Sequence, residues 1–173
     1  MMYDAIFKIV IFGDAGCGKT TLLKKYITDL FISDTRMTIG VDFETKTLHF
    51  DGLDVKLMIW DFGAEEWFRF IFPNYICGAM GGILMYDITN YSSLFHAIDW
   101  LTLIKGSENT IPIVLIGGKS DLEILREVSY DEGLTVTNDM NLHAFYECSS
   151  KTGENVEKVF HSLVKSMLNI ALV

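Results

Sequence analysis

The sequence contains little proline, little cysteine and little basic charge. Only 2 of its 173 residues are proline and half are apolar, which excludes a largely disordered chain. The three cysteines, at positions 17, 77 and 148, are odd in number and widely spaced, so they predict neither a disulfide framework nor a zinc site and indicate a reducing compartment. The 14 Lys and Arg against 23 Asp and Glu give a net charge of −9, which argues against nucleic acid or anionic lipid as the main partner.

Long hydrophobic segments are also missing. The longest uncharged apolar run, Ile76–Tyr86, has 11 residues, whereas a membrane span needs about 20, so we expect no transmembrane segment. The final residues MLNIALV include no cysteine that could carry a prenyl group. We therefore expect a cytoplasmic protein, and this C-terminus does not support peripheral membrane association unless a lipidated tail follows it.

Short apolar runs alternate with amphipathic segments, the pattern of a parallel sheet whose strands are joined by helices. Strands are predicted at residues 5–12, 41–50, 54–60, 80–87, 111–117 and 143–148. Helices are predicted at residues 19–29, 67–75, 90–105, 129–138 and 154–170, with Ser129 and Glu132 as a capping box. Asp51-Gly52 predicts a hairpin that makes one edge strand antiparallel. We expect one α/β domain over residues 1–173, a three-layer sandwich of six mostly parallel strands and five helices.

The segment Gly13–Thr20 (GDAGCGKT) matches the phosphate-binding pattern G-x-x-x-x-G-K-[ST] and lies between a predicted strand and a predicted helix. Lys19 would place a positive charge on the β- and γ-phosphates of a nucleotide, and Thr20 would offer a hydroxyl to Mg²⁺. The bland alternative is a glycine-rich turn with a solvated lysine. The nucleotide-binding residues expected here are Asp14, Ala15, Gly16, Cys17, Gly18, Lys19, Thr20 and Thr21.

Once this loop is recognised, nearly the whole chain resembles the Ras superfamily of small GTPases, and most closely its Rab branch. Thr38–Phe43 (TIGVDF) resembles the Rab effector segment, and Trp60-Asp61 followed by Glu66–Arg69 resembles the second switch. Gly117–Asp121 (GGKSD) and Glu147–Lys151 (ECSSK) are similar to the loops that hold guanine. The resemblance implies a P-loop NTPase fold of the Ras-like type.

The resemblance also implies roles for individual residues. Thr38 would close over the γ-phosphate and bind Mg²⁺ with Thr20, and Asp61 would hold this ion through a water unless it only caps its strand. Asp121 would select guanine, because one carboxylate accepts both N1–H and the 2-amino group, whereas adenine presents an acceptor at N1. The other residues expected at the base are Phe31, Lys119, Ser149, Ser150 and Lys151. For Phe31, packing within its loop is an equally good interpretation.

Three departures from the family pattern bear on function. Where the family has D-T-A-G-Q-E, this chain has DFGAEE, so Ala64 replaces the switch glycine and Glu65 replaces the glutamine that orients the attacking water. The N–H of Ala64 can still meet the γ-phosphate, but its Cβ restricts the backbone. Ionised Glu65 would repel the phosphates, since two like charges about 4 Å apart cost about 4 kcal/mol at an effective dielectric of about 20, although it could instead act as a general base. Gly118 replaces the asparagine of N-K-x-D, which predicts a loss of nucleotide affinity of about 1–3 kcal/mol.

We therefore predict a Rab-like molecular switch that binds GTP or GDP with Mg²⁺ and hydrolyses GTP slowly, with Lys19, Thr38 and Glu65 as catalytic residues. As a monomer, it would present residues 31–43 and 61–76 to effectors, exchange factors and GTPase-activating proteins. One alternative is a nucleotide-holding scaffold with negligible turnover. A second is a small-molecule kinase, but such kinases usually clamp phosphates with an arginine-rich lid, and this chain has only three arginines.

Overall fold

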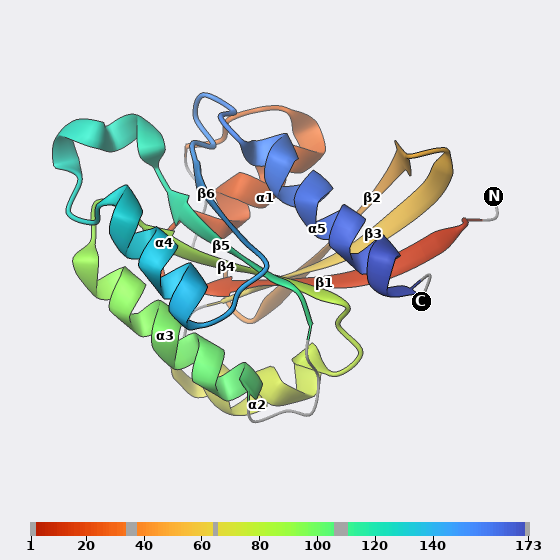
Figure 1. Ribbon diagram of the computed structural model, residues 1–173, viewed down its shortest axis with the longest axis horizontal. Coiled ribbons are helices and arrows are strands. Elements are labelled where there is room, and N and C mark those ends of the chain that lie inside the picture. Colours follow the sequence, from red (N-terminus) through yellow and green to blue (C-terminus); the bar gives the residue numbers. More distant parts are fainter. Residues whose placement is uncertain (1–2, 34–37, 64–65, 106–110, 172–173) are drawn as a thin grey trace.

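The computed structural model describes residues 3–33, 38–63, 66–105 and 111–171. A six-stranded sheet runs through the centre, in the order β2-β3-β1-β4-β5-β6 (Figure 1). Its strands are β1 (Ala5–Gly13), β2 (Val41–Phe50), β3 (Leu53–Phe62), β4 (Gly81–Asp87), β5 (Ile113–Gly118) and β6 (Ala144–Cys148). Within these described ranges only β2 pairs antiparallel, against β3, and the other pairs are parallel. The predicted mostly parallel sheet with one antiparallel edge is confirmed.

Five α-helices cover the two faces of the sheet. They are α1 (Lys19–Thr28), α2 (Glu66–Ile76), α3 (Tyr91–Lys105), α4 (Tyr130–Asp139) and α5 (Val156–Ala171). Helices α1 and α5 pack on one face, and α2, α3 and α4 pack on the other, which confirms the three-layer sandwich (Figure 1). No helix within the described ranges has the length and apolar character needed to cross a bilayer.

One element was not predicted, the short 3₁₀-helix η1 (Ser120–Leu125). None of its residues is buried, so its sequence carries no apolar stripe of helical period. Its position is set instead by the loop that it continues, because Leu122 N–H donates to the Lys119 carbonyl at 2.8 Å.

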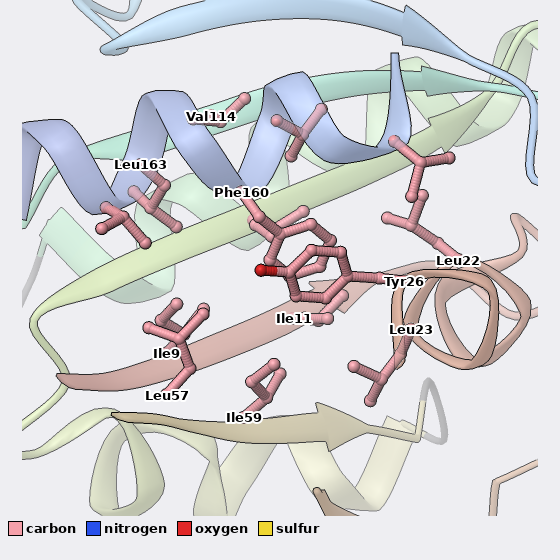
Figure 2. Packing of buried hydrophobic residues seen from close by; sticks show 14 of the residues in the cluster. Ile9, Ile11, Leu22, Leu23, Tyr26, Leu57, Ile59, Val114, Phe160 and Leu163 are labelled. Atoms are coloured by element: carbon pink, nitrogen blue, oxygen red, sulfur yellow. The ribbon is translucent and has the colours of Figure 1, made fainter. Parts of the chain in front are cut away.

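The core under α1 and α5 is built around two stacked aromatic rings. Tyr26 of α1 and Phe160 of α5 lie parallel, with centroids 3.6 Å apart, above Ile9 and Ile11 of β1 (Figure 2). Because α1 begins at Lys19, within the phosphate-loop motif, this packing fixes the loop relative to the sheet. The core therefore positions the segment in which binding residues are predicted.

Local signals account for the turns on both sides of the sheet. Asp51 and Gly52 both have positive φ, 49° and 84°, as the predicted hairpin requires. Ser129 Oγ accepts from the Glu132 backbone N–H while the Glu132 carboxylate accepts from the Ser129 N–H, so the predicted capping box is confirmed. Strand β3 continues two residues beyond its predicted end because Phe62 still pairs with Val41 of β2.

Candidate functional site

A cavity of about 580 Å³ opens where the carboxyl ends of the strands meet. It is lined by residues from the loops that follow β1, β3, β5 and β6, from the start of α1 and from the segment between α1 and β2. Met85 of β4 is also in the wall. The predicted site residues in its wall are Ala15, Gly16, Cys17, Gly18, Lys19, Thr20, Thr21, Phe31, Thr38, Lys119, Asp121, Ser150 and Lys151. The fold thus brings residues more than a hundred positions apart around one space.

The loop between β1 and α1 is shaped to surround an anion. Gly13 has φ 136°, and a Cβ there would lie 2.1 Å from the Met85 carbonyl oxygen, so only glycine fits. The Lys19 side chain is 7% exposed, and its Nζ donates to the carbonyls of Gly13 at 2.9 Å and Asp14 at 2.7 Å. The ammonium group is therefore held over the loop, at the N-terminus of α1, where backbone N–H groups also favour negative charge.

Three oxygen-bearing side chains meet beside this loop. Thr20 Oγ1 lies 2.8 Å from Thr38 Oγ1 and donates to Asp61 Oδ2 at 2.5 Å. Asp61 is fully buried, and its Oδ1 has no hydrogen-bond partner among the residues that the structure describes. Burial raises the pKa of the Asp61 carboxyl, and the Thr20 hydrogen bond and the Lys19 charge oppose that rise. A buried carboxylate oxygen without a partner is costly, and a bound hard cation would stabilise it.

The opposite end of the cavity holds the predicted guanine residues. Asp121 Oδ1 accepts a hydrogen bond of 2.6 Å from Ser149 Oγ, and Ser149 is fully buried. Lys119 has φ 65°, and its Nζ pairs with Asp87 Oδ2 at 2.5 Å. Phe31 lies in the cavity wall and is 44% exposed, so both interpretations of this residue stay predictions. The hydrogen bond from Ser149 thus fixes the orientation of the Asp121 carboxylate.

The sequence of this chain is similar to known proteins over most of its length. Residues 8–169 match the family model described as the Ras family. The chain is 42% identical over 164 residues to the Ras-related protein Rab-3 of Caenorhabditis elegans, which covers 94% of this chain and 74% of that protein. It is 37% identical over 169 residues to the Ras-related protein RABA2d of Arabidopsis thaliana, covering 97% and 77%. It is 38% identical over 167 residues to the GTP-binding protein ypt2 of Schizosaccharomyces pombe, covering 95% and 82%.

The chain belongs to the Ras family. It is a Rab-like small GTPase, as its phosphate loop and guanine segments predict. Members of this family bind GTP and GDP, generally with Mg²⁺, and the three oxygens beside the phosphate loop suit that ion because Mg²⁺ prefers oxygen ligands. The residues present therefore fit the cofactors that the family implies.

The second switch of this Rab-like GTPase approaches the first more closely than the family residue would permit. The Gly63 N–H donates to the Gly40 carbonyl at 2.7 Å, which continues the β2–β3 pairing toward the cavity. A Cβ on Gly63 would lie 2.5 Å from the Thr38 carbonyl oxygen and 2.9 Å from that of Gly40. The alanine that the family carries at this position does not fit here. Ala64 and Glu65 lie outside the described residues, so their predicted roles stay predictions.

The phosphate loop of this Rab-like GTPase is also tied to α3, a connection that no motif predicts. His96 Nδ1 lies 2.5 Å from Asp14 Oδ2, and Trp100 Nε1 donates to Asp14 Oδ1 at 3.4 Å. Asp14, one of the predicted nucleotide-binding residues, is not among the residues that line the cavity. His96 and Trp100 could not be found by sequence reasoning, because they lie 82 and 86 positions from Asp14.

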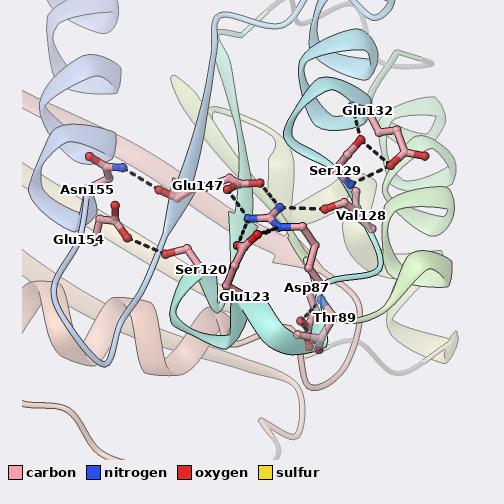
Figure 3. A network of polar contacts seen from close by, with 11 residues as sticks. Asp87, Thr89, Ser120, Glu123, Val128, Ser129, Glu132, Glu147, Glu154 and Asn155 are labelled. Carbon is pink, nitrogen blue, oxygen red and sulfur yellow. Dashed lines mark hydrogen bonds and ion pairs between the residues drawn. The ribbon is translucent and has the colours of Figure 1, made fainter.

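An ion-pair network joins the loops that follow β5 and β6, which carry the predicted guanine residues (Figure 3). The Arg126 guanidinium donates to both oxygens of Glu147, at 2.6 and 2.8 Å, and to Glu123 of η1. Its two carboxylate partners raise the pKa of Arg126 further above its ordinary value, so the charge is permanent. Ser120 Oγ donates to Glu154 across the same gap at 2.9 Å. The ECSSK segment is therefore linked to the segment that carries Asp121 and Arg126 through Glu147 as well as through Ser149.

Proposed function

We propose that this Rab-like GTPase binds GTP and GDP with Mg²⁺ in the cavity and acts as one monomeric, single-domain switch that hydrolyses GTP slowly. The observation that carries the proposal is the contact of Thr20, Thr38 and Asp61 beside the phosphate loop. Thr38 comes from the first switch segment, so the ligand that draws these oxygens together also fixes that segment. Asp121 selects guanine, with Phe31, Lys119, Ser150 and Lys151 around the base.

Hydrolysis needs the negative charge on the transferring phosphoryl group to be neutralised. Lys19 is already held over the loop by two carbonyls and supplies one positive charge, and Mg²⁺ on Thr20 and Thr38 supplies two more when bound. Glu65 adds negative charge where the family has glutamine, so the intrinsic rate is slow. Replacing Glu65 by glutamine removes that repulsion and restores a donor to the phosphate.

The switch segments carry an exposed aromatic surface beside the cavity. Phe43 of β2 is 44% exposed and lies edge-on to Trp60 of β3, with centroids 5.2 Å apart. Tyr75 of α2 lies 6.0 Å from the Trp60 ring, and Ile39 is 78% exposed. We propose that effectors and regulators bind this surface, because Ile39 directly follows Thr38 and the surface therefore changes shape with the nucleotide.

The experiment is a binding and turnover series on nucleotide-stripped protein. We expect GTP and GDP to bind in Mg²⁺ at least about 100-fold more tightly than ATP, since the carboxylate of Asp121 would face an acceptor on adenine. A single-turnover measurement of phosphate release should give a slow rate that rises in Glu65→Gln. Binding without release, even in Glu65→Gln, would instead identify a nucleotide-holding scaffold, and a preference for ATP would refute the proposal.

A further inference from the structure

Gly118 precedes Lys119 of the cavity wall and leaves a space that another side chain fills. Gly118 ends β5, at the position where the family has the asparagine of N-K-x-D. A Cβ built on Gly118 would lie 2.3 Å from Cε of Met85, the buried residue of β4 that lines the cavity. The methyl group of Met85 therefore occupies the volume that any side chain at position 118 requires.

The same methyl group lies beside the phosphate loop, and Met85 and Cys17 belong to one buried core cluster. A Cβ on Gly18 would lie 3.4 Å from Met85 Cε, and a Cβ on Gly118 would lie 3.0 Å from the Cys17 carbonyl oxygen. The end of Met85 thus lies between the backbone of the phosphate loop and the first residue of the guanine loop. Gly18 and Gly118 have no side chains to fill the space between the two loops. The thioether of Met85 occupies that space instead.

We propose that Met85 is a positioning residue that holds the phosphate loop and the guanine loop in register by packing, and that Met85 and Gly118 form a matched pair. This inference rests on the proposed nucleotide binding. An asparagine at 118 would join the loops by hydrogen bonds, whereas here close contact of a flexible, polarisable side chain does so. The affinity loss expected from Gly118 alone is then partly offset by Met85.

The pairing makes an unusual prediction about restoring the family residue. Gly118→Asn displaces the end of the Met85 side chain and brings its own Cβ to 3.0 Å from the Cys17 carbonyl oxygen. Overpacking of this kind costs about 1–3 kcal/mol. The single variant should therefore release GDP about 10-fold faster than the wild type. Met85→Val, which withdraws the methyl group, should also accelerate release, because the gap between the loops is left empty.

The test is a double-mutant cycle on the full chain. GDP release in Mg²⁺ and the thermal midpoint without nucleotide are measured for the wild type, Met85→Val, Gly118→Asn and the double variant. We expect the double variant to release GDP more slowly than Gly118→Asn, with a coupling of at least about 5-fold between the sites. Independent, multiplicative effects, or slower release in Gly118→Asn alone, would overturn the pairing. Should Gly118→Asn not fold, Gly118→Ala replaces it, because the Cβ already meets Met85.

A matched control lies in the same core. Met167 of α5 is buried and fills the space beside Gly81 of β4, where a Cβ would lie 2.8 Å from its sulfur, but it is absent from the cavity wall. Met167→Val removes a similar volume and should lower the thermal midpoint without changing GDP release. If Met167→Val accelerates release as much as Met85→Val, Met85 has only a packing role and the inference fails. A wild type that binds no GDP would overturn the proposed function as well, which distinguishes the two failures.

Discussion

The phosphate end of the cavity, around Lys19 and Thr20, and the base end, around Lys119 and Asp121, differ in how far their residues depart from the family motifs. At the phosphate end, Lys19, Thr20 and Asp61 keep the residue types of the family motif. Lys19 Nζ donates to the Gly13 carbonyl, and Thr20 Oγ1 donates to Asp61. At the base end, Gly118 has replaced a hydrogen-bonding side chain, and the methyl group of Met85 occupies the vacated volume. Residues of both ends nevertheless line one cavity, among them Lys19, Thr20 and Met85.

The difference shows what packing can replace. A side chain whose task is to keep two loops apart at a fixed distance can be exchanged for another of suitable volume, because close contact is not directional. A buried carboxylate that meets a cation cannot be exchanged in this way, because the cost of burying charge is offset only by opposite charge or hydrogen bonds. We therefore expect polar substitutions at the phosphate end to have larger effects than apolar exchanges in the same wall.

The largest effect is expected from Asp61→Asn. In Mg²⁺ the variant should bind GTP and GDP about 100-fold more weakly, as expected when a charged ligand group worth about 3 kcal/mol is lost. Titration with nucleotide at fixed Mg²⁺, repeated in EDTA, measures this, and in EDTA the difference from the wild type should disappear. Equal affinities in Mg²⁺ would contradict the metal role of Asp61.

The same variant should have the opposite effect on the protein free of metal and nucleotide. Because burial raises the folded-state pKa of Asp61, the folded protein holds this proton to higher pH than the unfolded chain does. The free energy of unfolding therefore declines as pH rises from the ordinary carboxyl range through the raised pKa. Asp61→Asn removes that decline, so its thermal midpoint at pH 7 should exceed that of the wild type. A thermal midpoint of Asp61→Asn below that of the wild type at pH 7 would contradict this explanation.

Base recognition should depend strongly on one carboxylate. IDP lacks the 2-amino group of GDP, and a hydrogen bond to a charged acceptor contributes about 1.5–3 kcal/mol, so GDP should bind about 10–100-fold more tightly than IDP. Asp121→Asn should reduce this preference, since its amide carbonyl is the only acceptor that remains. Competition binding with the two diphosphates gives the ratio. An unchanged ratio in Asp121→Asn would place guanine elsewhere in the cavity.

A smaller effect is expected from Gly63→Ala, which restores the residue that the family carries. The new methyl group would meet the carbonyl oxygens of Thr38 and Gly40, and relieving this overlap costs about 1–3 kcal/mol. The Gly63 contact is with Thr38, whose hydroxyl lies beside that of Thr20. We therefore expect the affinity for a non-hydrolysable GTP analogue to fall about 10-fold relative to the affinity for GDP. Thr45→Ala, on the exposed part of β2, should leave the ratio unchanged. A ratio unaffected by Gly63→Ala would show that the two switch segments separate when nucleotide binds.

The smallest effect is expected from Cys17→Val, an apolar exchange at the phosphate end itself. Cys17 is buried, burial raises the pKa of its thiol, and Sγ contacts the Asp14 carbonyl at 3.0 Å. A buried neutral thiol behaves as a small apolar group, so the variant should change GDP affinity by less than about 3-fold and the free energy of unfolding by less than about 1.5 kcal/mol. Calorimetry and nucleotide release measure both. A large loss of affinity would mean that the thiol itself contacts the nucleotide.

Much of the fold could be predicted because its signals are local. The hairpin at Asp51-Gly52 and the capping box at Ser129 depend on residues a few positions apart, and each formed as predicted. The 3₁₀-helix η1 was missed because an exposed six-residue turn carries no apolar period. The contact of Asp14 with His96 was missed for another reason. The two residues lie 82 positions apart in different elements, and no motif around either one indicates the other.

The sequence by itself determined the alternation of strands and helices and the phosphate loop, because apolar period and glycine spacing act between near neighbours on the chain. Only the tertiary structure decided that the unpaired oxygen of Asp61 lies beside Thr20, and that Met85 fills the space left by Gly118. These contacts join positions 41 and 33 residues apart (61 − 20 and 118 − 85). Such distant partners meet only when the sheet forms, and close packing then decides which side chain fills each remaining volume.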